Sequence, residues 1–120
     1  MKVLLVTKKT PADSSSYWAQ GGIAAVMGSD DSFDEHVRDT LLAGAGLCNE
    51  AVVRRVVEAA PAALHWLIEQ GAPFDLEGAE YHLTREGGHS RRRILHARDA
   101  TGRAVQDTLL AQVAKRANIT

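Results

Sequence analysis

The strongest constraint on the fold is a continuous apolar run at residues 3–6, bounded by Lys2 and by the polar residues 7–9. An apolar run of this length, without alternating polar residues, predicts a short strand buried on both faces, as in a parallel sheet. Almost every later stretch carries a helical period or none, except short segments such as residues 94–97. We therefore expect an α/β fold. An isolated pair of short strands is marginal in water, so we expect residues 1–120 to be one contiguous partial domain, truncated at both ends.

Local signals predict where the first and last helices begin. Ser32 stands three residues before Glu35, which is the capping-box pattern, in which each side chain accepts from the backbone N–H of the other residue. This pattern predicts a helix over Phe33–Ala43. Apolar residues at helical spacing predict a last helix over residues 102–116.

The longest predicted helix lies between these two. Asn49 can cap it, and apolar residues then recur at i, i+3 and i+4 spacing to residue 70. Pro61 falls inside this pattern, where the missing N–H and the crowded preceding turn cost about 3 kcal/mol. The sequence therefore predicts a helix that is kinked at Pro61 or divided in two.

The overall composition argues against several classes of function. Lys and Arg number 14 against 15 Asp and Glu, so the formal net charge is −1, unlike that of a general nucleic-acid binder. Cys48 is the only cysteine, which favours a reducing compartment, by default the cytoplasm. No apolar run approaches the roughly 20 residues that span a bilayer, so we expect no membrane partner. His82, His89 and His96 lack the compact spacing of a metal site, and we expect no metal.

A polar, glycine-containing segment after the predicted strand is the first candidate site. It carries hydroxyls, an amide side chain and two glycines, whose backbone N–H groups can approach a phosphate or a heteroaromatic ring. Ligands of open parallel sheets bind beyond the carboxyl ends of the strands. The segment is typical of a nucleotide-cofactor loop or, alternatively, of a polar surface turn. Its residues are Ser15, Ser16, Tyr17, Trp18, Ala19, Gln20, Gly21 and Gly22.

A cationic segment at residues 82–93 is the second candidate site. It combines arginines, two imidazoles and the carboxylate of Glu86 around Gly87 and Gly88. A dicarboxylate or a phosphate would suit these cations, but a solvated basic loop has the same composition. Nucleic-acid binding is disfavoured because no aromatic residues are interleaved.

Four blocks in the same order make the chain resemble the L-aspartate oxidase family, within the succinate dehydrogenase and fumarate reductase flavoproteins. The blocks are residues 15–26, 39–46, 82–90 and 93–102. The similarity covers essentially all 120 residues, although the family's proteins are several times longer. It implies part of a Rossmann-like FAD-binding domain with several helices. The first strand and the GxGxxG turn that holds the FAD pyrophosphate in such folds are missing from this sequence.

The resemblance also implies roles for particular residues. It places Lys8 near the adenosine end of FAD, and Ser15, Ser16, Tyr17, Trp18, Ala19, Gln20, Gly21 and Gly22 along the flavin. Ser15 stands where related flavoproteins often carry a histidine joined covalently to the flavin, so the FAD should be non-covalent. Glu86 stands where those relatives usually have Phe, which makes it the candidate for recognising the substrate ammonium. His89 is the second substrate-binding candidate, and the arginine that the family uses for proton transfer is absent.

The function implied is oxidation of L-aspartate to iminoaspartate with FAD, in de novo NAD biosynthesis. Oxygen or fumarate would then take the electrons, and quinolinate synthase would be a partner that receives the product. The 120 residues alone would be inactive. Two alternatives stay open: a piece of a fumarate reductase or succinate dehydrogenase flavoprotein, and a non-catalytic anion-binding or interaction module.

Overall fold

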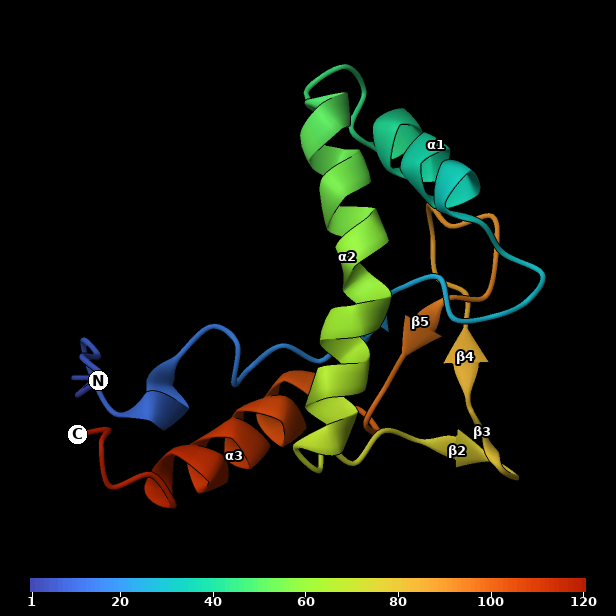
Figure 1. Ribbon diagram of the computed structural model, residues 1–120. Helices are drawn as coiled ribbons and strands as arrows, with labels where there is room; N and C mark the ends of the chain where they lie inside the picture. Colours follow the sequence, from blue (N-terminus) through green and yellow to red (C-terminus); the bar gives the residue numbers. More distant parts are fainter.

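Helices supply most of the regular structure, and every strand is only two residues long. The computed structural model describes residues 1–120 and confirms the α/β class (Figure 1). The helices are the 3-10 helix η1 (Pro11–Asp13) and the α-helices α1 (Phe33–Ala43), α2 (Glu50–Glu69) and α3 (Thr101–Ala114). The strands are β1 (Ile23–Ala24), β2 (Leu76–Glu77), β3 (Glu80–Tyr81), β4 (Leu83–Thr84) and β5 (Ile94–Leu95).

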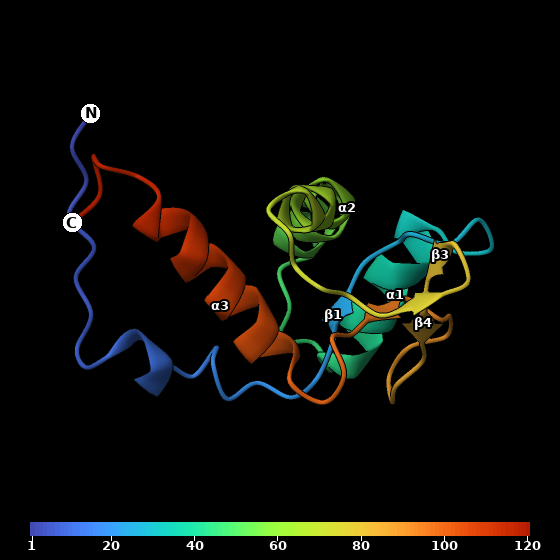
Figure 2. The same cartoon turned by 90° about the horizontal axis from the view of Figure 1, so that it is seen from below.

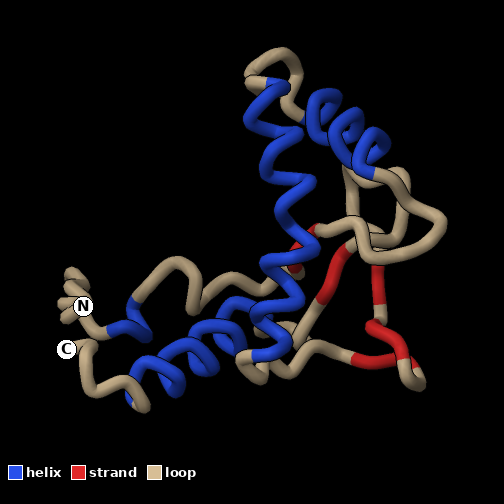
Figure 3. Tube along the Cα trace, in the orientation of Figure 1, coloured by secondary structure: helices blue, strands red, loops and turns tan.

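The strands form a three-stranded sheet, in the order β1-β5-β4, and a separate β2-β3 hairpin. Both outer strands are antiparallel to β5: Ile23 and Leu83 pair with Leu95, while Ala24 and Thr84 pair with Ile94. Figure 3 shows these strands gathered beside one half of α2. The sheet is small, and it is stable only because helices pack against it.

The apolar run at residues 3–6 is extended, but it is not the buried strand that the sequence predicts. Val3 forms a parallel bridge with Ile119, and the Leu5 N–H donates to the Thr120 carbonyl at 2.8 Å. Yet Leu4 and Val6 are 72% and 77% exposed. Figure 2 shows the two ends of the chain side by side, away from the sheet. The prediction of burial on both faces is wrong because no residue of the run is buried, and even Val3 and Leu5 are 39% and 50% exposed.

The two predicted N-caps are confirmed. The Ser32 side chain accepts from the Glu35 N–H, and the Asn49 side chain accepts from the Val52 N–H. The reciprocal half of the capping box is absent because the Glu35 carboxylate binds Arg91 instead.

Helix α2 continues unbroken through Pro61, so of the two predicted alternatives the division into two helices is wrong. Val57 and Leu64, one turn to either side of Pro61, are 4% and 2% exposed. Burial of a large aliphatic side chain contributes about 1.5–3 kcal/mol. Two such contacts flanking the proline offset the cost of the lost hydrogen bond.

The core lies where α2 crosses the three-stranded sheet. Its buried residues come from β1, α2, β5 and the segments beside them: Ala25, Leu64, Ala72, Phe74, Leu95 and Ala97. Beyond β5, the Thr101 hydroxyl accepts from the Ala97 N–H at 3.1 Å and fixes the start of α3. None of the helices has the length and apolar character needed to cross a membrane.

Candidate functional site

The two candidate segments continue the two outer strands of the sheet. Residues 15–22 lead directly into β1, while Arg85 and Glu86 directly follow β4. Because β1 and β4 run in the same direction, the segments lie at opposite ends of the strands. A rise of about 3.3 Å per residue and a strand spacing of about 4.8 Å place the Cα atoms of Gly22 and Arg85 roughly 14 Å apart. The structure therefore brings both segments to one sheet but not into direct contact.

The first segment lies on the start of α3. The Gly102 N–H donates to the Ala19 carbonyl at 3.0 Å, and the Ser14 hydroxyl donates to the Gln106 Oε1 at 2.6 Å. The Arg103 guanidinium lies 5.5 Å from the centre of the Tyr17 ring, a cation–π geometry. These contacts hold the segment against α3 while leaving much of its outer surface exposed.

Gly21 and Gly22 have different roles. A Cβ atom at Gly22 would overlap the Ile94 side chain and the Leu95 carbonyl, so glycine is needed for close approach to β5. A Cβ at Gly21 would meet nothing within 4 Å. The backbone N–H groups of Gln20, Gly21 and Gly22 donate to no acceptor in the chain. They are free to bind a ligand or water.

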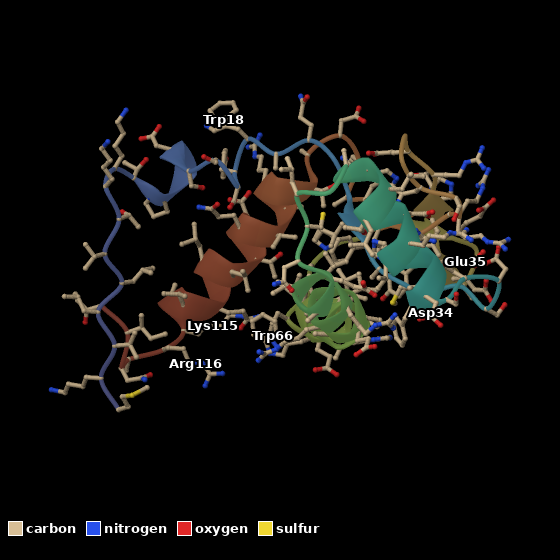
Figure 4. The ribbon with its side chains drawn as sticks, turned by 90° about the horizontal axis from the view of Figure 1, so that it is seen from above. Trp18, Asp34, Glu35, Trp66, Lys115 and Arg116 are labelled. Carbon is tan, nitrogen blue, oxygen red and sulfur yellow. The ribbon has the colours of Figure 1, made fainter.

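Two cavities along α3 are lined by five of the nine predicted cofactor residues. A cavity of about 380 Å³ lies between α3 and the first segment, and Ser16, Gly21 and Gly22 line it. A second cavity of about 510 Å³ is lined by Lys8. Gln106 borders both cavities. Trp18 is 73% exposed and projects away from the helices, lining neither cavity (Figure 4).

These features fit the FAD that the resemblance implies. The smaller cavity has an apolar wall formed by Ile23, Val105 and Leu109, suited to a flat aromatic ring. The free backbone N–H groups and the Ser16 side chain supply polar contacts at the same cavity. The ammonium of Lys8 forms no ion pair and is available to an anionic group. No group of His, Cys, Asp or Glu side chains is arranged to hold a metal ion.

The second segment forms a tight turn at residues 86–89. The His89 N–H donates to the Glu86 carbonyl at 3.2 Å, and Gly88 has φ +84°, a conformation that favours glycine. The Glu86 side chain is exposed and makes no hydrogen bond or ion pair. An uncommitted carboxylate beside an imidazole is therefore presented at the surface.

A buried ion cluster, which the sequence analysis missed, lies beneath this turn. The Arg93 side chain is completely buried, and its Nε and Nη2 donate to the two carboxylate oxygens of Asp31, both at 2.7 Å. Its Nη1 donates to the Asp39 Oδ2 at 2.7 Å. The same oxygen accepts from both the N–H and the hydroxyl of Ser90, each at 2.7 Å. Paired and fully hydrogen-bonded charges of this kind can be buried, whereas unpaired ones cannot.

The cluster perturbs two titratable groups. Burial raises the pKa of Asp39, but hydrogen bonds from Ser90 and Arg93 outweigh this effect and lower the pKa to about 2. Burial lowers the pKa of His36, and the positive charge of Arg93 acts in the same direction. The His36 Nδ1 is buried without a hydrogen-bond partner, and its ring lies 5.7 Å from the ring of His89.

Most of the cationic segment is thus not a free basic surface. Arg93 binds Asp31 and Asp39, and Arg91 binds Glu35 at 3.0 Å through Nη2. Arg85 and Arg92 remain without carboxylate partners. One signal could have singled out Arg93: it is the arginine next to the apolar residues 94–95, which form the buried strand.

The comparisons with known proteins agree with one another. The family described as FAD binding domain matches residues 1–120. L-aspartate oxidase 1 of Ralstonia nicotianae is 57% identical over 122 residues, which cover 99% of this chain and 23% of the relative. The L-aspartate oxidase of Pseudomonas aeruginosa is 53% identical over 127 residues, covering 99% and 24%. The chain thus spans about a quarter of the length of these curated relatives.

Solved structures have the same fold. A mutant of the E. coli quinol fumarate reductase superposes with a TM-score of 0.93 at 32% identity, covering 99% of this chain and 20% of that one. The Mycobacterium smegmatis Sdh1 complex with UQ1 gives a TM-score of 0.88 at 30% identity, covering 99% and 22%. Nearly the whole of this chain therefore has the same fold as the matching fifth of these two proteins.

Proposed function

This chain belongs to the FAD binding domain family, whose cofactor is FAD, and we propose that it forms part of an FAD-dependent L-aspartate oxidase. The identity of 57% with a curated L-aspartate oxidase supports this proposal. The observation that carries it is the Glu86 carboxylate, which is exposed and unpaired on the turn that also bears His89. Residues 1–120 would act as one contiguous part of the cofactor-binding domain.

Glu86 suits a substrate with an ammonium group. Aspartate carries two carboxylates and an ammonium, while fumarate and succinate carry only the carboxylates. A carboxylate near the amine supplies a charge-assisted hydrogen bond of about 1.5–3 kcal/mol. The ammonium would otherwise lose its hydration without compensation. Glu86 would therefore discriminate aspartate from the other dicarboxylates.

Residues 15–22 would hold the flavin by its edge and one face. When bound, FAD accepts the hydride from the substrate Cα. The free N–H groups of Gln20, Gly21 and Gly22 would donate to the cofactor, and the wall that includes Val105 would pack on its ring. Ser15 offers a hydroxyl rather than an imidazole, which fits non-covalent binding.

One alternative has a specific observation in its favour. The chain superposes closely on a quinol fumarate reductase, with a TM-score of 0.93. An enzyme of that kind would bind fumarate without needing the Glu86 carboxylate. In the proposed oxidase, fumarate or oxygen would instead accept the electrons, and a quinolinate synthase would receive the imino product.

A chimaera provides the test. Residues 1–120 replace the matching segment of the Ralstonia nicotianae enzyme, and Glu86→Gln is made in that background. We expect kcat/KM for L-aspartate to fall roughly 10- to 100-fold, as expected from the lost charge-assisted contact, while fumarate reduction by the reduced enzyme changes little. Glu80→Gln, which removes another exposed carboxylate without an ion pair, is the control and should leave both activities intact. Equal losses with both substrates would show that Glu86 supports the turn rather than recognising the amine.

A further inference from the structure

We propose that Arg93 is a positioning residue for the turn at residues 86–89, setting the tautomer of His89 and anchoring Ser90 through Asp39. The substrate that the turn would bind rests on the proposed function, but the positioning itself rests on the geometry of the buried cluster alone. No side chain of this cluster is required to touch substrate or cofactor.

The tautomer follows from the donor chemistry of arginine. A guanidinium has five N–H donors and no acceptor. The Arg93 Nη1 lies 3.5 Å from the His89 Nδ1 in hydrogen-bonding geometry. Nδ1 must therefore accept, and the proton of the neutral ring is carried by Nε2. His89 consequently has an N–H donor at Nε2.

Asp39 links the guanidinium to the backbone of the turn. Its Oδ2 accepts from the Arg93 Nη1, the Ser90 N–H and the Ser90 hydroxyl, all at 2.7 Å. Ser90 directly follows His89, so these bonds fix the chain where it leaves the turn. The Arg93 and Asp31 side chains are fully buried and that of Asp39 is 9% exposed, so water cannot readily replace the contacts.

The His36 ring is a second neighbour of His89. The two ring centres are 5.7 Å apart with an angle of 60° between the planes. The His89 ring thus has two neighbours in the cluster region, the His36 ring and the Arg93 guanidinium. The turn therefore combines one fixed donor, the His89 Nε2–H, with one acceptor, the Glu86 carboxylate. This pairing matches a ligand that carries a carboxylate and an ammonium close together.

Nitrogen NMR of the ¹⁵N-histidine-labelled chain tests the tautomer directly. The two nitrogen shifts of a neutral imidazole distinguish its tautomers, so the spectra are recorded at alkaline pH. His89→Gln assigns the resonances. We expect the neutral His89 ring to carry its proton on Nε2. A proton on Nδ1 in the spectrum of the unmutated chain would by itself overturn the proposal.

Two matched substitutions test the role of the arginine. Arg93→Lys keeps the positive charge but loses the planar guanidinium that binds two carboxylates at once. We therefore expect His89 to populate both neutral tautomers, and the Ser90 N–H to exchange its hydrogen at least tenfold faster. Arg91→Lys is the control because Arg91 also binds a carboxylate, that of Glu35, but does not contact His89. It should leave the His89 shifts and the Ser90 exchange rate unchanged. Unchanged shifts in Arg93→Lys, or equal changes in both variants, would refute the positioning role.

Kinetics of the chimaera separate this proposal from the proposed function. Arg93→Lys should lower kcat/KM for aspartate and for fumarate by similar factors, about tenfold, because both ligands carry the carboxylate that the His89 N–H would bind. Glu86→Gln should affect aspartate alone. An Arg93→Lys effect confined to aspartate would contradict the positioning role, whereas a Glu86→Gln effect shared by both substrates would contradict only the proposed function.

Discussion

Replacing Asp39 with asparagine tests whether the buried ion cluster stabilises the fold. The pKa of Asp39 falls from 3.8 to about 2 in the folded chain, which corresponds to about 2.5 kcal/mol of stabilisation at neutral pH. The new amide would still accept a hydrogen bond, but Arg93 would be left with one buried carboxylate partner, Asp31. We expect Asp39→Asn to lower the free energy of unfolding by about 2–3 kcal/mol at pH 7.

The dependence on pH has a definite sign. Because folding lowers the pKa of Asp39, the unfolded chain takes up the proton first as the pH falls. The contribution is complete well above pH 3.8 and is lost as the pH falls towards about 2. Asparagine does not titrate. The difference in stability between the original chain and Asp39→Asn should therefore be constant from about pH 7 to 5 and shrink towards pH 3.

Urea unfolding followed by circular dichroism at 222 nm measures these differences, with Asp34→Asn as the control. Asp34 pairs with Arg54 at 2.8 Å, a distance close to that in the buried cluster, but the side chains are 83% and 42% exposed. An exposed pair contributes less than about 1 kcal/mol. Equal destabilisation by the two substitutions would refute the argument from burial. If the difference in free energy of unfolding between the original chain and Asp39→Asn were the same at about pH 3 as at pH 7, the argument from titration would be refuted.

Two further predictions concern other parts of the site. Gly22→Ala should lower the free energy of unfolding by about 1–3 kcal/mol, because the added methyl group overlaps β5. Gly21→Ala, whose methyl group faces open space, should change it by less than about 0.5 kcal/mol. Equal urea midpoints for the two variants would contradict the close approach at Gly22. Burial lowers the pKa of His36 below 6.5, so stability should fall as the pH drops from 6.5. His36→Leu should weaken this pH dependence, and an unaltered profile in this variant would assign the acid sensitivity to another group.

The helices were predictable because their signals are local. Ser32 and Asn49 each accept from the backbone N–H three residues ahead, and these bonds depend only on the adjoining turn. The unbroken course of α2 through Pro61 was not predictable in the same way. It depends on burial, and the core cluster that buries Leu64 includes Ala25 and Leu95, which are distant in sequence.

The candidate segments were also identifiable from the sequence, but what supports them was not. The contacts of Arg93 with Asp31 and Asp39 join residues separated by 62 and 54 positions. No spacing rule relates such residues, and a run of three arginines is more often a solvated surface. Burial divides this run: Arg93 belongs to the core cluster, whereas Arg92 is exposed.

The central strand β5 connects the two candidate surfaces mechanically. On one side it pairs with β1, and Gly22 packs closely against its Ile94 and Leu95. On the other side it pairs with β4, which leads into the turn bearing Glu86. The residue before β5 is Arg93, whose N–H donates to the Thr84 carbonyl and whose carbonyl accepts from the Ala25 N–H. Since protein interiors are close-packed, a displacement of this two-residue strand would move the cofactor segment and the turn together. The backbone of the proposed flavin-binding segment is thus held relative to the turn that bears Glu86 by the backbone hydrogen bonds of β5.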